Sequence, residues 1–158
     1  MNRSGFTVME LIIVMLMTVI LVGSIVTVFI STSHAWSAGN DRAQVRENMS
    51  QAMELMVRDL RQATSIDVLS VSSVTYTANT GSGSTQYRFA LYRPASGTTY
   101  QLLRSLGADA AGTGAVLLGG IPSANAFTRT GNVITIDLTA YSGAQGIEMR
   151  TKAFLREF

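Results

Sequence analysis

The chain has 158 residues, a formal net charge of +2 and no cysteine. This length allows one membrane helix and one modest globular domain, but not two ordinary hydrophobic cores. The lack of cysteine excludes disulfides and thiolate metal sites, and a single histidine argues against a histidine-based metal site or catalytic triad. The basic residues are scattered along the chain, so the charge pattern gives no support for a nucleic-acid partner.

A long apolar run dominates the N-terminal part of the sequence. No charged residue occurs between Glu10 and Asp41, and residues 11–30 are almost entirely apolar. Because a helix rises about 1.5 Å per residue, a run of about 20 residues crosses the roughly 30 Å hydrocarbon core of a bilayer. We therefore predict a single-pass membrane helix over residues 6–30. Arg3 precedes it, which places the short N-terminus in the cytoplasm and the rest of the chain outside.

An ordinary cleaved signal peptide is the alternative interpretation of this segment. Ser33, His34 and Ala35 form a small-x-small cleavage site before Trp36. The apolar core of such peptides is usually only about 7–15 residues long. The longer run in this chain, with Glu10 at its head, favours a membrane helix instead.

The helical pattern continues beyond the apolar run. Apolar residues recur every three or four positions, which is the spacing of an amphipathic helix. They are Val45, Met49, Ala52, Met53, Met56, Leu60 and Ala63. We assign residues 31–64 to this continuation. The sequence leaves open whether the helix breaks at Gly39 and Asn40, a glycine followed by a good capping residue.

Beyond Thr64 the apolar period changes from about 3.6 to 2 residues, which predicts β-strands. The expected strands cover residues 66–71, 74–77, 86–93, 99–106, 116–118, 127–129, 133–139 and 147–155. Turn residues join 86–93 to 99–106, and 127–129 to 133–139, as hairpins. Consecutive hairpins form an antiparallel sheet, and the apolar stripe of the helix is available to cover one face. The expected fold class is α+β, with a β-sheet domain over residues 65–158.

No set of residues in the sequence forms a recognisable catalytic or metal site. Asp67, Asp109, Asp137 and Glu148 are too dispersed to indicate a calcium site. Residues 112–114, Gly-Thr-Gly, lack the third glycine of a dinucleotide-binding loop. No serine stands in a nucleophile motif. We therefore expect no enzymatic activity, no cofactor and no metal.

The start of the apolar run carries the most specific motif. Gly5, Phe6, Thr7, Glu10 and Leu11 read G-F-T-x-x-E-L and open an apolar helix. This pattern resembles the signal of type IV prepilins and type II secretion pseudopilins. The resemblance implies that residues 1–5 are a leader, that a prepilin peptidase cleaves after Gly5, and that the new N-terminal Phe6 is methylated. It also implies a pilin-like fold, with a long N-terminal helix packed on the β domain.

The motif also has a physical rationale. Cleavage after Gly5 removes Arg3 and leaves a cationic amine on Phe6, four residues before Glu10 on the same helical face. Each charge alone is costly in hydrocarbon, whereas a pair of opposite charges is tolerable. We expect Glu10 of an incoming subunit to meet the amine of Phe6 on a neighbouring subunit. The alternative is a plain membrane anchor with a tolerated interfacial glutamate, but such an anchor has no need of this junction, so the length and the motif together favour the pilin interpretation.

A second, less specific resemblance concerns residues 46–63 and the C-terminal end. The segment RENMSQAMELMVRDLRQA, followed by a β domain that ends Ala153-Phe154-Leu155-Arg156, is similar to minor pilins of the PilW type and to J-type minor pseudopilins. In those families such subunits join a priming complex at the filament tip. The chain lacks the helix-bending proline that many major pilins contain, since its first proline is Pro94.

Together these features favour a minor pilin or pseudopilin that waits in the bacterial inner membrane and then enters a filament. The implied partners are other pilin or pseudopilin subunits, the prepilin peptidase, the inner-membrane assembly platform and membrane lipid. The alternative is a single-span anchored extracellular binding domain that forms no filament. The mass of the mature chain separates these hypotheses: a start at methylated Phe6 favours the first, intact Met1 the second, and Trp36 a secreted protein. The sequence does not indicate whether the machine is a secretion system, a pilus or a DNA-uptake filament.

Overall fold

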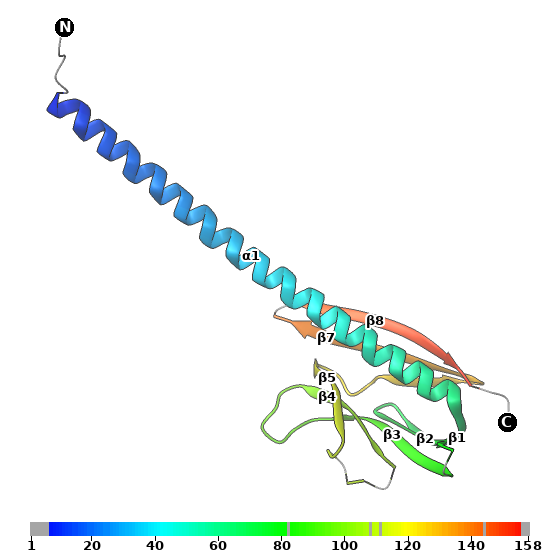
Figure 1. Cartoon of the computed structure of the whole chain (residues 1–158). Helices are drawn as coiled ribbons and strands as arrows, with labels where there is room; N and C mark the ends of the chain where they lie inside the picture. Colours follow the sequence, from blue (N-terminus) through cyan, green and yellow to red (C-terminus); the bar gives the residue numbers. More distant parts are fainter. Residues whose placement is uncertain (1–6, 82, 108, 111, 144, 156–158) are drawn as a thin grey trace. The chain divides into compact units, whose positions relative to one another are not determined.

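A computed structural model describes residues 7–81, 83–107, 109–110, 112–143 and 145–155 of the chain. The chain divides into two compact units, Met1–Asn40 and Asp41–Phe158. One helix, α1 (Val8–Gln62), supplies the described secondary structure of the first unit and the opening segment of the second. Figure 1 shows this helix and the strands that follow it. The fold class is α+β, as the sequence predicts.

Helix α1 continues through Gly39 and Asn40 without a break. The sequence left open whether the helix breaks at these two residues. The helix ends at Gln62, two residues before the expected limit at Thr64. Ala63 is instead the first residue of the first strand. The helix therefore gives way directly to a strand, with no intervening loop.

Five strands form the first sheet, in the order β1-β2-β3-β4-β5, and every neighbouring pair is antiparallel. Their bounds are β1 (Ala63–Ser70), β2 (Ser73–Asn79), β3 (Ser84–Tyr92), β4 (Tyr100–Leu106) and β5 (Ala115–Ile121). The expected strands lie within two or three residues of these bounds. The hairpin of β3 and β4, which residues 86–93 and 99–106 predict, is confirmed by pairs such as Phe89 with Arg104.

The remaining strands form a second, three-stranded antiparallel sheet in the order β6-β7-β8. Their bounds are β6 (Phe127–Thr130), β7 (Val133–Ser142) and β8 (Gln145–Phe154). The predicted β6–β7 hairpin is confirmed, and Thr130 pairs with Val133 around a two-residue turn. Gly131 in that turn has a φ of 59°, a value that favours glycine.

The sequence predicts one sheet, whereas the described residues form two. The separation occurs at residues 122–126, between β5 and β6. Pro122 has no backbone N–H to continue a ladder. The N–H groups of Ala126 and Phe127 donate to the Val71 carbonyl oxygen, at 2.8 and 3.1 Å. The chain therefore leaves the first sheet at β5 and begins the second beside the turn that joins β1 to β2.

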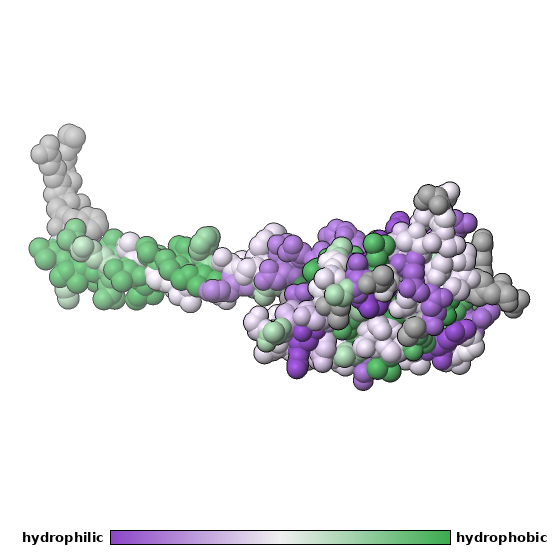
Figure 2. All heavy atoms as spheres, turned by 90° about the horizontal axis from the view of Figure 1, so that it is seen from below, coloured by the Kyte–Doolittle hydropathy of each residue, from purple (hydrophilic) through white to green (hydrophobic). Residues whose placement is uncertain are grey.

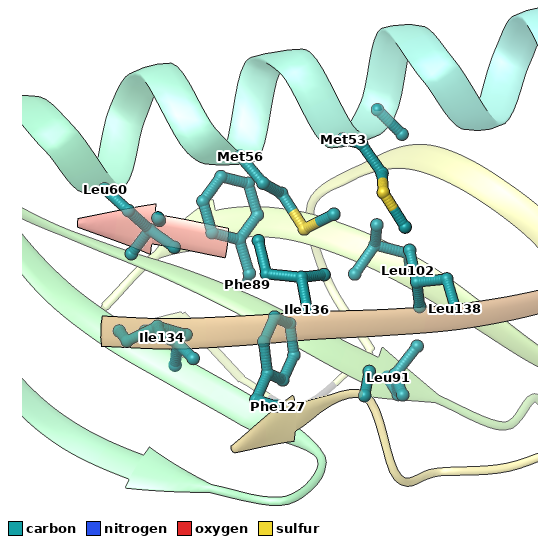
Figure 3. Packing of buried hydrophobic residues seen from close by; sticks show 14 of the residues in the cluster. Met53, Met56, Leu60, Phe89, Leu91, Leu102, Phe127, Ile134, Ile136 and Leu138 are labelled. Carbon is teal, nitrogen blue, oxygen red and sulfur yellow. The ribbon is translucent and has the colours of Figure 1, made fainter. Parts of the chain in front are cut away.

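The helix and the two sheets share one hydrophobic core within the second unit. The α1 side chains that enter it recur every three or four residues: Met49, Ala52, Met53, Met56 and Leu60 are each at most 5% exposed. They pack with Phe89 and Leu102 of the first sheet and with Ile136 and Leu138 of the second. Figure 3 shows Met53, Met56 and Leu60 of the helix converging with side chains of the strands. The predicted role of the helical stripe as the cover of the β-sheet domain is therefore confirmed.

A partly buried polar cluster fastens α1 to the first sheet. Asp59 Oδ2 accepts hydrogen bonds from the Tyr76 hydroxyl at 2.9 Å and from Arg104 Nε at 3.0 Å. Tyr76 also stacks on Phe89, with ring centroids 5.4 Å apart. Burial, reinforced by the negative charge of Asp59, raises the pKa of Tyr76 well above its ordinary value. The cluster joins the helix to β2 and β4 through charge-assisted bonds.

We predict that Met56→Ala destabilises the second unit by about 2–5 kcal/mol, because it leaves a cavity in a fully buried site. The measurement is denaturant unfolding of the full chain in detergent, followed by near-ultraviolet circular dichroism. Gln51→Ala, on the exposed side of α1, is the matched control and should unfold like the wild type. Equal losses for the two variants would contradict the assigned core.

The raised pKa of Tyr76 predicts a loss of stability at alkaline pH. Unfolded tyrosines lose their proton near pH 10, about the ordinary pKa. Folded Tyr76 keeps its proton there, so the contribution of its raised pKa is complete below this pH and declines as the pH rises above it. Tyr76→Phe should lower the free energy of unfolding by about 1 kcal/mol at neutral pH and flatten the alkaline decline. Tyr141→Phe, at an exposed tyrosine, should retain the wild-type pH dependence. An unchanged decline in Tyr76→Phe would disprove this role.

Candidate functional site

Thr7 and Glu10 form a reciprocal cap at the start of α1. Glu10 Oε2 accepts hydrogen bonds from the Thr7 backbone N–H at 3.1 Å and from the Thr7 hydroxyl at 3.2 Å. The Glu10 backbone N–H in turn donates to Thr7 Oγ1 at 3.3 Å. This is a capping box, in which residues three positions apart satisfy helix N–H groups that have no intrahelical acceptor. The pattern Thr-x-x-Glu before an apolar run is the sequence signature of this cap, which neither the charge-pairing hypothesis nor the plain-anchor alternative for Glu10 includes.

The predicted processing residues Gly5 and Phe6 lie outside the described residues. Among the predicted site residues, only Glu10 has a described environment, and it is exposed. Its recorded side-chain bonds all use Oε2. The cap therefore leaves Oε1 without a bond to a described residue, so one carboxylate oxygen can accept a further donor.

The described part of the first unit has an apolar surface with no protein cover. Every large hydrophobic residue of α1 from Val8 to Ile30 is at least half exposed. Its most apolar window has a mean hydropathy of 2.9, and α1 is long and apolar enough to cross a membrane. Figure 2 shows hydrophobic residues over this surface and mixed polarity over the second unit. A helix that is apolar all round requires lipid or other helices around it.

The hydroxyl groups within this apolar surface are satisfied by the helix itself. Thr18 donates to the Val14 carbonyl oxygen at 2.8 Å, and Thr27 donates to the Gly23 carbonyl oxygen at 2.9 Å. Ser24 donates in the same way to Ile20. Because each hydroxyl has an acceptor one turn earlier, none adds an unpaired donor in an apolar environment.

The dispersed acids of the second unit mostly have structural partners. Asp67 accepts hydrogen bonds from Gln86, Thr77 and Ser65, which lower its pKa. Asp109 Oδ2 accepts from the Leu106 backbone N–H at 3.0 Å. These bonds hold neighbouring strands and turns together. In the described residues, no group of three or more His, Cys, Asp or Glu side chains could hold a metal ion.

Folding does bring two of the dispersed acids together. Asp137 and Glu148 line one polar cavity of about 280 Å³, together with Ser123 and Asn125. Asp137 Oδ2, however, already accepts from Arg150 Nε at 2.8 Å and from Arg150 Nη2. This arginine neutralises one of the two carboxylates, which argues against a cation in the cavity.

A larger open groove of about 590 Å³ lies between α1 and β8. Three arginines and one glutamate line it: Arg58, Arg61, Arg150 and Glu54. Ser50 and Thr151 also line it, but neither hydroxyl makes a hydrogen bond to Glu54 in the described residues, and Arg58 is largely exposed. The groove is thus a charged, open surface of the second unit. Sequence patterns could not identify it, because α1 and β8 are far apart in the chain.

Comparisons with protein-family models, with curated proteins and with solved structures each find no match to this chain.

Proposed function

We propose that the chain is a minor pilin or pseudopilin, a subunit of a type IV pilus or of a type II secretion-like filament. The observation that carries the proposal is the apolar surface of α1 over residues 8–30, which begins beside an acidic residue and has no cover within the chain. In the membrane, lipid covers this surface. In a filament, the helices of neighbouring subunits replace the lipid.

The proposal assigns the contact between subunits to the carboxylate of Glu10. A carboxylate at the head of an apolar helix is expensive to place near hydrocarbon. The capping box offsets part of that cost through bonds to Oε2, and Oε1 remains for a second donor. In the proposal, that donor is the amine of Phe6 on a neighbouring subunit, which is created when the peptidase cleaves after Gly5.

The resemblance of residues 46–63 to PilW-type minor pilins and J-type pseudopilins supports a place in the priming complex at the filament tip. The subunit would reside in the bacterial inner membrane, with its C-terminal domain on the extracytoplasmic side, until the assembly platform draws it into the filament. No catalytic role is part of this proposal.

The capping box also favours a second candidate, a single-span anchored binding domain. In that case Glu10 serves only to begin the helix, and no subunit contact is needed. The two candidates differ in whether the charge of Glu10 is required, which substitution can test directly.

We predict that Gly5→Ala leaves the precursor uncut, because the resemblance assigns the cleavage to the bond after this glycine. Intact-mass measurement of the membrane-extracted chain should give a species that starts at Met1. Ser4→Ala, one residue earlier, is the control and should still yield a chain that starts at methylated Phe6. Cleavage of both variants would contradict the assigned processing site.

We predict that Glu10→Gln and Glu10→Ala both spare cleavage but reduce assembly about tenfold or more, since each removes the charge of the pair. The measurement is co-purification of the full chain with co-expressed minor pilins, together with filament yield. Glutamine can still close a capping box, so Glu10→Gln isolates the charge.

Thr7→Ala is the matched control, because it removes the two cap bonds that the Thr7 hydroxyl makes while it keeps the Glu10 carboxylate. It should assemble at close to the wild-type level. If Thr7→Ala fails while Glu10→Gln assembles normally, Glu10 acts through the cap and the pairing argument is wrong.

A further inference from the structure

The outer edge of β8 has no partner strand among the described residues. The second sheet has the order β6-β7-β8, so β8 pairs with β7 on one side only. With ten residues, β8 is as long as β7, whereas β6 at the opposite edge has four. A long open edge presents a row of backbone N–H and carbonyl groups that can pair with a further strand.

The register of β7 and β8 shows which backbone groups face this edge. The Leu155 N–H donates to the Asn132 carbonyl oxygen at 2.8 Å, and the same register continues through β8. In an antiparallel pair, every second residue bonds to the partner strand, and the residues between them turn their backbone groups away. The odd-numbered residues of β8 therefore bond to β7. The groups that face the open edge belong to the even-numbered residues: Gly146, Glu148, Arg150, Lys152 and Phe154.

The groove of about 590 Å³ between α1 and β8 adjoins this edge. Among the described residues, β8 is the only strand that lines the groove. The α1 residues that line it, apart from Met53, are not the core residues of the helical stripe. The groove therefore lies on the flank of the helix and not beneath it. A strand added to β8 would lie along this groove.

The floor of the groove is apolar. Met53 is buried, and Val57 and Met149 are partly buried and pack against the core. Successive side chains of a strand point to opposite faces, so every second side chain of an added strand would lie over this floor. Apolar side chains complement those positions, because they cover the floor without burying an unpaired polar group.

The charged residues of the groove leave one positive charge without a counter-charge. The Arg150 guanidinium is already bound to Asp137. Glu54 and Arg58 lie four residues apart on α1, a spacing at which opposite charges offset each other. Arg61 makes no ion pair or hydrogen bond with the part of the chain that the structure describes. An acidic side chain of the added strand is the complement of Arg61.

We propose that the open edge of β8 accepts an antiparallel strand from another protein. The backbone of this strand pairs with the even-numbered residues of β8 and continues the antiparallel pattern of the second sheet. Its side chains that face α1 are apolar, except for one glutamate or aspartate beside Arg61. This proposal is independent of the filament proposal, since it concerns only α1 and β8 within the second unit.

The test uses the full chain in detergent micelles and a fluorescein-labelled nonapeptide. Valine and threonine alternate in this peptide, and glutamate replaces the central valine. Fluorescence anisotropy, corrected for empty micelles, should show saturable binding with a dissociation constant on the order of 0.1 mM. The same peptide with lysine at its centre should bind about fivefold more weakly, because lysine meets the positive charge of Arg61.

Methylation of the peptide amides separates strand pairing from simple adhesion to the groove. In the proposed arrangement the valine side chains face α1, so the threonine amides turn to β8. N-methylation of the threonines should abolish binding, because it removes these donors and blocks the edge. N-methylation of the valines is the matched control and should leave binding within about threefold, since those amides face solvent. This comparison alters only the peptide, so it does not depend on how a protein variant folds.

A charge reversal tests the role of Arg61. Arg61→Glu should reverse the preference, so that the lysine peptide binds about fivefold more tightly than the glutamate peptide. Loss of folding would weaken both peptides alike and could not produce this reversal. Arg46→Glu, at an exposed arginine of α1 outside the groove, is the matched control and should keep the wild-type preference.

No saturable binding of the glutamate peptide, equal binding after N-methylation of the threonines, or an unaltered preference in Arg61→Glu would each overturn the proposal. Analytical ultracentrifugation without peptide should give one chain per micelle. A dimer that excludes the peptide would assign the edge to a second copy of the chain and would also overturn it. If nothing pairs with the edge, β8 is a solvated strand that Glu148 and Lys152 protect from pairing.

Discussion

The burial of one apolar stripe of α1 is the contact on which the second unit depends. Met49, Met53, Met56 and Leu60 meet side chains of both sheets. Among the described residues, the backbone hydrogen bonds between the two sheet regions are those that Ala126 and Phe127 donate to the Val71 carbonyl oxygen. The helix is therefore a structural element shared by both sheets. Asp59 of α1 strengthens the attachment to the first sheet, because it accepts hydrogen bonds from Tyr76 and Arg104. These charge-assisted bonds fix the position of α1 on β2 and β4.

The same helix meets two different environments along its length. Over residues 8–30 it is apolar on every side, and its few hydroxyls bond back to their own helix. From Met49 onward only one face is apolar, and that face is buried in protein. A helix of the first kind needs lipid or similar helices, whereas one of the second kind is complete once it packs on a sheet. Glu10 lies at the start of the fully apolar segment. There its hydrogen bonds to Thr7 and its negative charge have separate effects.

The polar groups of the second unit differ in how fully they are satisfied. Asp67 and Asp137 engage side chains of neighbouring strands and serve as links within the fold. Arg88 is the exception, because its Nε is buried without an acceptor among the described residues. Unsatisfied donors of this kind are rare in native proteins. Arg88 Nη2, in contrast, holds the residues that follow β4, through the Asp109 and Ala110 carbonyl oxygens.

The sequence alone determined the helix, its change of character and most of the strands, because these follow from local periodicity. The three-to-four residue spacing from Met49 to Leu60 and the alternation in residues 133–139 each describe one element and its buried face. The capping box was also readable, as Thr7 and Glu10 stand three positions apart. Only the tertiary structure decided that the strands divide into two sheets at Pro122, that Asp59 meets Tyr76 and Arg104, and that α1 and β8 border one groove. These features join residues far apart in the chain, and periodicity carries no information about which distant residues pack together.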